Sequence, residues 1–351
     1  MLKRAYLHTH TQMHRAAPTS RIVPVLLDAS FRKATRLFLT PHVCYQLFLL
    51  LPRSAGGSQV PYFLDEAADW AMTTANLEMA AEKARAEGVN PRALCIINPG
   101  NPTGQVMTEE NIAEVIDWAA ANGVLLMADE VYQTNVYDPD MEFHSFKKVL
   151  RAGPHADTVE LVSFHSTSKG VIGECGMRGG YLELCNIHPE TADDVYKSLS
   201  VNLCSNLPGQ VMTDLMVNPP KEGDPSYALY KEEFDGIFTS LTRRAKKLVA
   251  GLNDLEGVTC NASSGAMYAF PSITMPDKFV EDCAKSGVPA DTKYCLELLD
   301  ATGICVVPGS GFGQVDGTWH FRTTFLPQED AMDSVNDRLA TFHNEFLSKW
   351  K

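Results

Sequence analysis

Near its start, the 351-residue chain has no apolar run long enough to span a bilayer, because the longest one covers only residues 47–51. Its nine cysteines are odd in number and form no Cys-x-x-Cys pair, which argues against a disulfide framework and indicates free thiols in a reducing compartment. No histidine pair has metal-ligand spacing on an expected helix, so we predict no metal. Residues 309–313 are rich in glycine but lack the lysine that ends a nucleotide phosphate-binding loop, and are interpreted as a turn.

Acidic residues are scarce at the start of the chain. Residues 1–64 hold eight lysines and arginines but one acid, Asp28, whereas the whole chain has a net charge of −13. This charge argues against nucleic acid or a membrane surface as the main partner. Residues 1–55 are therefore set apart as an atypical basic segment. Residues 1–40 are compatible with a mitochondrial transit peptide. A segment without a targeting role is the favoured interpretation, which predicts a cytoplasmic protein, with a mitochondrial one as the alternative.

Apolar residues make up 45% of the chain, which is enough to build the cores of two domains. From about residue 59, helical segments alternate with short apolar runs that are expected to be strands, at residues 93–97, 124–128, 160–164 and 179–184. This alternation predicts an α/β fold with a mostly parallel sheet in a large domain, residues 56–235. A smaller α/β domain is expected over residues 236–351. Long helices are predicted at about 227–254 and 328–349.

One helix of the large domain is marked at both ends. Thr108 is expected to cap its N-terminus, and Asn122-Gly123 to end it. Its apolar residues fall at i, i+3, i+4 and i+7, which predicts one buried stripe made of Ile112, Val115, Ile116 and Ala119.

Polar residues follow three of the expected strands. The turn at residues 98–104 follows the first, Asp129 follows the second, and residues 166–169 (Ser-Thr-Ser-Lys) follow the third. In a parallel α/β sheet, ligands bind outside the carboxyl ends of the strands. The side chains at these three ends are therefore expected to share one site.

This set of residues matches what pyridoxal phosphate needs. The Lys169 amine can form a Schiff base with an aldehyde, while Ser166, Ser168 and Arg178 can bind a phosphate. Asp129 at the end of an apolar strand needs a cation to offset the cost of burial, and a protonated pyridine nitrogen is such a cation. Two of these residues also have a simpler interpretation: a surface position is the default for a lysine such as Lys169, and helix capping is the commoner role of an aspartate such as Asp129.

Three further residues are candidates for binding the same ligands. The Asn101 amide can donate to a ring oxygen of the cofactor and to a substrate carboxylate, although residues 101–104 could be only a tight turn. Tyr132 can donate to the ring oxygen, with a core tyrosine as the alternative. Arg322 stands alone on a short apolar strand, where it could clamp a substrate carboxylate or form an interdomain salt bridge.

The chain resembles the class I and II aminotransferases, which are pyridoxal-phosphate enzymes of fold type I, and within them the alanine aminotransferases. The resemblance covers about residues 56–351. It rests on five blocks, at residues 98–106 (NPGNPTGQV), 128–136 (ADEVYQTNV), 143–149 (FHSFKKV), 166–180 (STSKGVIGECGMRGG) and 320–327 (HFRTTFLP).

The resemblance implies roles for the candidate residues and a reaction. Lys169 would be the Schiff-base lysine and general acid/base, and Asp129 the partner of the pyridine nitrogen. The other implied ligands are Asn101 and Tyr132 for the ring oxygen, Ser166, Ser168 and Arg178 for phosphate, and Arg322 and Asn101 for the substrate. The reaction would be transfer of the amino group from L-alanine to 2-oxoglutarate, giving pyruvate and L-glutamate. The protein would be a homodimer, and its small-molecule partners would be amino and 2-oxo acids.

The chain departs from the family at its front. Family members carry a longer N-terminal region, which includes a small-residue turn that cups the phosphate and an aromatic residue that stacks on the ring. Neither is found in residues 1–55, so the large domain is expected to be N-terminally truncated. An inactive remnant and an enzyme for another amino-acid pair are the alternatives to an alanine aminotransferase.

Overall fold

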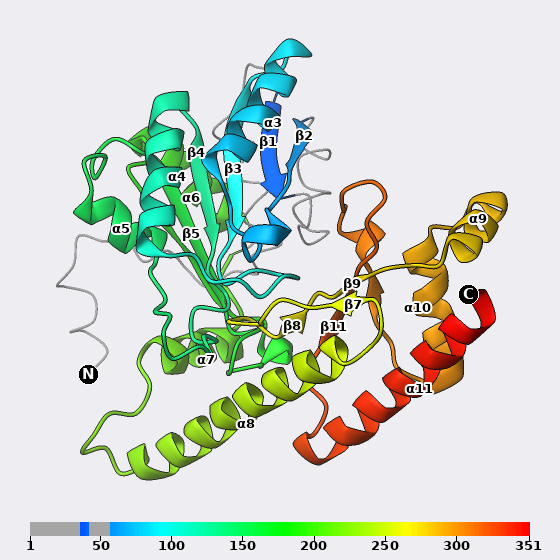
Figure 1. Ribbon diagram of the computed structural model, residues 1–351. Coiled ribbons are helices and arrows are strands. Elements are labelled where there is room, and N and C mark those ends of the chain that lie inside the picture. Colours follow the sequence, from blue (N-terminus) through cyan, green and yellow to red (C-terminus); the bar gives the residue numbers. More distant parts are fainter. Residues whose placement is uncertain (1–35, 42–56, 202) are drawn as a thin grey trace.

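A six-stranded sheet forms the larger part of the computed structural model, which describes residues 36–41, 57–201 and 203–351 (Figure 1). The sheet order is β2-β1-β3-β4-β5-β6, and every neighbouring pair is parallel except β5 with β6. The strands are β1 (Arg36–Pro41), β2 (Gly57–Tyr62), β3 (Pro91–Ile97), β4 (Leu125–Asp129), β5 (Leu161–Ser166) and β6 (Gly180–Cys185). The predicted mostly parallel α/β sheet is confirmed.

Helices cover both faces of this sheet. One core joins the sheet to α3 (Thr74–Ala86), α4 (Glu109–Asn122) and α5 (Phe146–Ala152), and the other face packs against α6 (Pro189–Ser200). The central strands β3 and β4 are therefore buried on both sides, which explains why they are continuous apolar runs rather than alternating ones.

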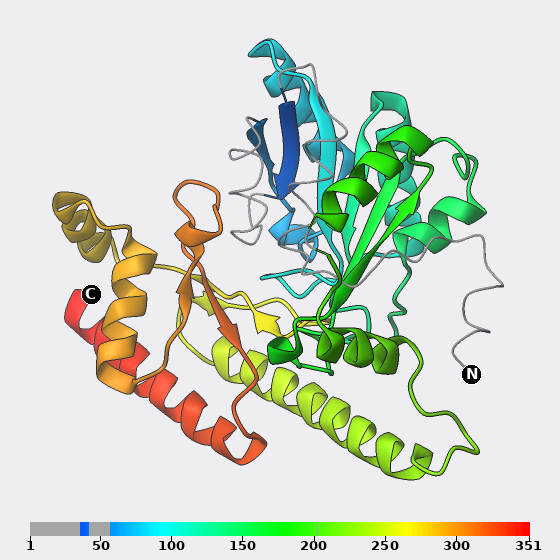
Figure 2. The same ribbon diagram turned by 180° about the vertical axis from the view of Figure 1, so that it is seen from behind.

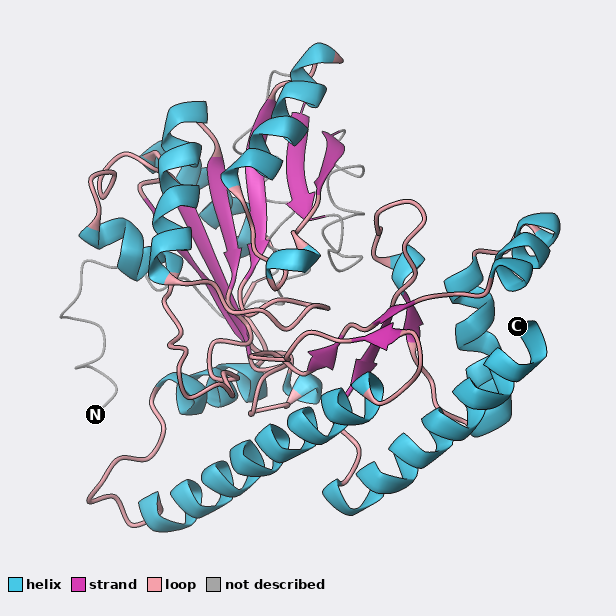
Figure 3. Cartoon of the chain, viewed as in Figure 1, coloured by secondary structure: helices cyan, strands magenta, loops and turns pink. Residues whose placement is uncertain are grey.

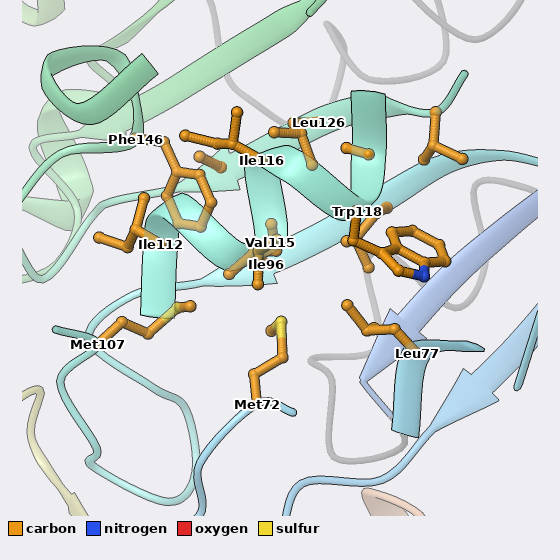
Figure 4. Close-up of a cluster of buried hydrophobic side chains, with 14 of the residues drawn as sticks. Met72, Leu77, Ile96, Met107, Ile112, Val115, Ile116, Trp118, Leu126 and Phe146 are labelled. Carbon is orange, nitrogen blue, oxygen red and sulfur yellow. The ribbon is translucent and has the colours of Figure 1, made fainter. Parts of the chain in front are cut away.

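Helix α4 forms as its sequence predicts. The Thr108 Oγ1 accepts a hydrogen bond from the Asn111 backbone N–H at 3.2 Å, and Gly123 ends the helix in the left-handed conformation with φ 61°. The expected stripe is buried and packs on the sheet, as Figure 4 shows for Ile112, Val115 and Ile116, which share one cluster with Ile96.

The second part of the chain has its own core (Figures 2 and 3). It contains a three-stranded sheet in the order β10-β11-β8 and a two-stranded sheet, β7-β9. The elements are α8 (Tyr227–Asn253), β7 (Val258–Thr259), β8 (Tyr268–Ala269), β9 (Ser272–Ile273), α9 (Asp277–Ser286), α10 (Ala290–Thr302), β10 (Val307–Pro308), β11 (Phe321–Thr324) and α11 (Met332–Trp350). The proposed domain boundary at residues 235/236 falls inside α8, and the division stays a prediction.

Several elements were not expected from the sequence, among them one helix beside the site and one strand in the basic segment. Helix α7 (Leu207–Val217) begins with Pro208 and Gly209 in its first turn, where proline is compatible with a helix because its missing N–H is not needed. Strand β1 lies within the basic segment at residues 1–55. The rest of that segment, up to residue 55, lies outside the described residues. The prediction that it lacks a phosphate cup and a stacking aromatic residue therefore falls on residues that the structure does not describe.

None of the helices within the described ranges is both long enough and apolar enough to cross a membrane.

Candidate active site

The carboxyl ends of β3, β4 and β5 meet at one edge of the large sheet. Ile97 pairs with Asp129, and Asp129 pairs with Phe164. Beyond the strands, the Asn98 N–H donates to the Asp129 carbonyl at 3.0 Å, and the Glu130 N–H donates to the Phe164 carbonyl at 3.1 Å. The loop with Asn101, the carboxyl of Asp129 and the turn with Lys169 are therefore held side by side.

The Asp129 carboxyl is poorly solvated. The Asp129 side chain is only partly exposed, and protein atoms surround its carboxyl group. This burial raises the pKa of Asp129 to about 6. Two weaker effects oppose this rise: the Val131 N–H donates to Oδ1 at 3.2 Å, and the Lys169 charge favours the ionised form. Asp129 is thus a carboxylate that lacks a strong cationic partner among the residues that the structure describes.

Glu130, which was not among the predicted residues, serves α5 instead. Its Oε1 accepts the Phe146 backbone N–H at 2.8 Å, and burial raises its pKa to about 7. Its position directly after Asp129 was the only signal in the sequence, and this contact explains why the two adjacent acids have different partners.

The residues expected to bind phosphate lie together in the turn after β5. The Ser166 hydroxyl donates to the Gly179 carbonyl at 3.1 Å and accepts the Ser168 N–H at 3.1 Å. The Arg178 Nη1 donates to the Ser168 hydroxyl at 3.3 Å and to the Cys175 carbonyl at 2.7 Å. Two hydroxyls and a guanidinium therefore converge on one turn.

Helix α7 supports this turn from the side. The Asn206 Nδ2 donates to the Arg178 carbonyl at 3.1 Å. At Gly209, a Cβ atom would lie 2.8 Å from the carbonyl oxygens of both Arg178 and Met177, so only glycine allows this close approach.

Lys169 is partly buried at the start of the same turn. Among the described residues, its amine has no hydrogen-bond or ion-pair partner, although its charge acts on Asp129. Gly170 follows with φ +67° and fits closely beside Asn135 and the Val131 carbonyl. The close packing at Gly170 thus holds the backbone next to Lys169, while the Lys169 amine has no partner among the described residues and can react with a ligand.

Asn101, Tyr132 and Arg322 approach the same edge from both parts of the chain. The Arg322 Nη1 donates to the Asn101 Oδ1 at 3.1 Å, and the Tyr132 hydroxyl lies 2.8 Å from the Tyr268 hydroxyl. The Arg322 Nε is buried and has no hydrogen-bond partner in the described parts of the chain. No carboxylate pairs with Arg322 there, so the interdomain salt bridge is not seen.

Two aromatic residues at this site were missed from the sequence. The Arg322 Cζ lies 4.5 Å from the centroid of the Tyr268 ring and 4.9 Å from that of Phe312. Tyr268 looks like an ordinary core position on a short apolar strand, and Phe312 lies in the glycine-rich run at residues 309–313 that was interpreted as a turn.

Comparison with known proteins places these observations in context. The model of a family described as aminotransferase class I and II matches residues 22–339, so the match extends into the basic segment. Alanine aminotransferase 2, mitochondrial, of Arabidopsis thaliana is 48% identical over 96% of this chain and 62% of its own length. A probable alanine aminotransferase, mitochondrial, of Dictyostelium discoideum is 51% identical over 89% and 59%, and glutamate–glyoxylate aminotransferase 1 of A. thaliana is 45% identical over 94% and 69%.

The chain spans about three fifths of the length of the first of these curated relatives. Among solved structures, an alanine aminotransferase from Pyrococcus furiosus superposes with a TM-score of 0.77 at 23% identity, over 94% of this chain and 75% of that one. The aspartate aminotransferase of Rhizobium meliloti gives 0.73 at 20% identity, over 94% and 76%. These structures share the fold.

Proposed function

The chain belongs to the class I and II aminotransferase family, and on this basis we propose that it transfers an amino group from L-alanine to 2-oxoglutarate with pyridoxal phosphate as cofactor. The products are pyruvate and L-glutamate. The names of the relatives at 48% and 51% identity support this choice of substrates. Because glutamate–glyoxylate aminotransferases are nearly as similar, another amino-acid pair is the second candidate.

The chemistry of the site fits the cofactor at three points. Asp129 is a poorly solvated carboxyl at a strand end, where a protonated ring nitrogen would stabilise its ionised form. The Ser168 and Arg178 side chains form a cationic, hydroxyl-bearing turn suited to a phosphate. The Lys169 amine has no competing partner among the described residues. When bound, pyridoxal phosphate supplies an aldehyde that combines with amines and a ring that accepts electrons.

Separate residues of the chain bind the phosphate, the ring nitrogen and the ring oxygen of the cofactor. Ser166, Ser168 and Arg178 bind the phosphate, and Asp129 keeps the ring nitrogen protonated. Tyr132 and the Asn101 amide donate to the ring oxygen.

Lys169 and Arg322 act on the substrate. The Arg322 guanidinium binds the α-carboxylate. Its buried Nε, which has no partner among the described residues, supports this role because a buried N–H donor without an acceptor is costly. As general acid/base, Lys169 Nζ would remove the proton from the substrate α-carbon and deliver it to the cofactor's aldehyde carbon. In the second half-reaction the same residues act in reverse on 2-oxoglutarate.

The observation that carries the proposal is that Asp129 and Lys169 lie at one sheet edge, where Arg322 reaches Asn101 from β11. Among the described residues, neither Lys169 nor Arg322 forms an ion pair with a carboxylate. The test is to mix the full chain with pyridoxal phosphate, reduce with borohydride and locate the adduct by peptide mass. We expect covalent attachment at Lys169, none in Lys169→Ala, and pyruvate formation from alanine in single turnover.

The outcomes separate the candidates. Attachment without turnover of alanine, but with turnover of another amino acid, would favour the second substrate pair. No attachment at Lys169 would leave the chain as an inactive remnant and would contradict the proposal.

We also propose a homodimer, formed in part through α7. Leu207, Val211 and Leu215 stand at i, i+4 and i+8 of this helix and are 71%, 53% and 50% exposed. A stripe of apolar side chains this exposed is typical of a protein interface.

The compartment is a proposal as well. We place the protein in the cytoplasm, with the mitochondrion as the alternative that the names of several relatives favour. A fusion of residues 1–55 to a fluorescent protein would import into mitochondria only if the alternative holds.

A further inference from the structure

The guanidinium of Arg322 lies between two aromatic rings. Its Cζ is over the Tyr268 ring at 4.5 Å and over the Phe312 ring at 4.9 Å, and the two rings are only 4% and 6% exposed. Tyr268 stands on β8, which pairs directly with β11, so that Thr324 faces Tyr268 across the two strands. Phe312 follows β10 on the other side of β11 and is backed by Phe270, whose ring is 6.0 Å away.

The N–H donors of a guanidinium lie in its plane, so a hydrogen-bond acceptor must reach Arg322 at its edge. Aromatic faces attract a cation but offer no hydrogen-bond acceptor in its plane. Asn101 Oδ1 takes one of the edge donors, Nη1, whereas Nε stays buried and unpartnered among the described residues. A planar carboxylate can bind bidentately only along such an edge. The two rings therefore fix the position of the charge beside Asn101.

The Tyr268 side chain also reaches the cofactor side of the site. Its hydroxyl lies 2.8 Å from that of Tyr132, and the two rings meet edge to face at 5.8 Å. The Ser263 hydroxyl donates to the Tyr268 carbonyl at 2.7 Å, which holds the backbone in place. One of the two tyrosine hydroxyls must donate to the other. If Tyr132 donates to a ring oxygen, it has to accept from Tyr268.

We propose that Tyr268 is a positioning residue with two separable parts: its ring, together with Phe312, holds Arg322 for the substrate carboxylate, and its hydroxyl directs the Tyr132 proton toward the cofactor. The assignment rests on the proposed function, since it takes Arg322 and Tyr132 as the ligands of substrate and cofactor. Burial raises the pKa of Tyr132 above its ordinary value, which keeps this hydroxyl protonated and able to donate.

The ring is tested without cofactor or turnover. Phenylglyoxal labels arginine, and the labelling of Arg322 is followed by peptide mass at increasing concentrations of glutarate, with glutaramide as the probe that lacks carboxylates. We expect glutarate alone to protect Arg322 in the wild type and in Tyr268→Phe at similar concentrations. Tyr268→Leu and Phe312→Leu should need about tenfold more glutarate, as expected for loss of one cation–π contact.

The hydroxyl is tested on the chain loaded with pyridoxal phosphate. Tyr268→Phe removes the donor to Tyr132, so the ionised ring oxygen loses stabilisation and the pH midpoint of the cofactor's visible absorbance should rise. The control is Tyr294→Phe, which removes another buried tyrosine hydroxyl, 3.0 Å from His343 Nδ1, in the core of the second part of the chain. This control should leave both measurements unchanged.

Each outcome decides one claim. Wild-type protection in both leucine variants, checked to be folded by thermal unfolding, would overturn the role of the rings. So would failure of glutarate to protect the wild type. Equal weakening in Tyr268→Phe and Tyr268→Leu would assign the effect to the hydroxyl instead, and an unmoved pH midpoint in Tyr268→Phe would overturn the hydroxyl's role. If Arg322 is protected but Lys169 never takes up the cofactor, the proposed function fails while the carboxylate clamp stands.

Discussion

At the scale of single residues, Asp129 links the chemistry of the site to the stability of the chain. Its pKa is raised from an ordinary 3.8 to about 6 by burial, so the folded state holds this proton more tightly than the unfolded state does. The contribution of Asp129 to the free energy of unfolding therefore falls as the pH rises from about 4 to about 6. Above that range, ionised Asp129 lowers the free energy of unfolding by about 3 kcal/mol. A carboxylate held under such a penalty is available to stabilise a bound cation.

We accordingly predict that Asp129→Asn stabilises the cofactor-free chain at pH 7 and has little effect near pH 4. Urea unfolding of both proteins across this range measures the difference. The pKa of Glu130 is raised mainly by burial and partly by the Asp129 charge, so Asp129→Asn also relieves Glu130 and adds to the stabilisation in the same direction. The variant should lose the stabilisation that pyridoxal phosphate gives the wild type. A difference in stability that is the same at pH 4 and pH 7 would contradict the assignment.

How much of the site could be predicted from the sequence also depends on the residue. Lys169, Asp129 and Arg178 could be predicted to lie together because each follows a strand, or its turn, at the same sheet edge. Tyr268 and Phe312 could not, since their role arises from the pairing of β11 with strands on both sides of it. Such pairings join residues far apart in the chain and leave no local pattern.

At the scale of elements, local signals explain which helices were foreseen. Helix α4 has a cap, a glycine stop and an apolar stripe, and all of them were confirmed. Helix α7 was missed because Pro208 and Gly209, which together are typical of a turn, stand in its first turn. Its packing against the Arg178 turn explains the glycine, because that contact needs a residue without Cβ.

Gly209→Ala should therefore weaken the site through the backbone. Its new methyl group meets the carbonyl oxygens of Met177 and Arg178 at 2.8 Å, and we expect a loss of about 1–3 kcal/mol together with weaker binding of pyridoxal phosphate. Gly236→Ala is the matched control, because nothing lies within 4 Å of the added atom in the middle of α8. The control should gain about 0.5–1 kcal/mol. Equal effects of the two substitutions, measured by urea unfolding, would argue against a supporting role for α7.

At the scale of the whole molecule, the two faces of α7 connect association with the site. One face carries Gly209 and touches the turn of Arg178, and the other exposes Leu207, Val211 and Leu215. If a second copy covers the exposed stripe, the helix is held from both sides, and the phosphate-binding turn is steadied by the dimer.

We predict that Val211→Glu raises the dimer dissociation constant at least about tenfold, because a carboxylate would be buried in the interface without a partner. Sedimentation velocity over a range of concentrations measures the shift, and Leu296→Glu on α10, 54% exposed in the wild type, is the control that should leave the dimer intact. Since Val211 is 53% exposed in the single chain, the variant should fold normally as a monomer and take up pyridoxal phosphate less tightly. A wild type that sediments as a monomer, or a Val211→Glu dimer of unchanged affinity, would show that the stripe on α7 is covered by something other than a second copy.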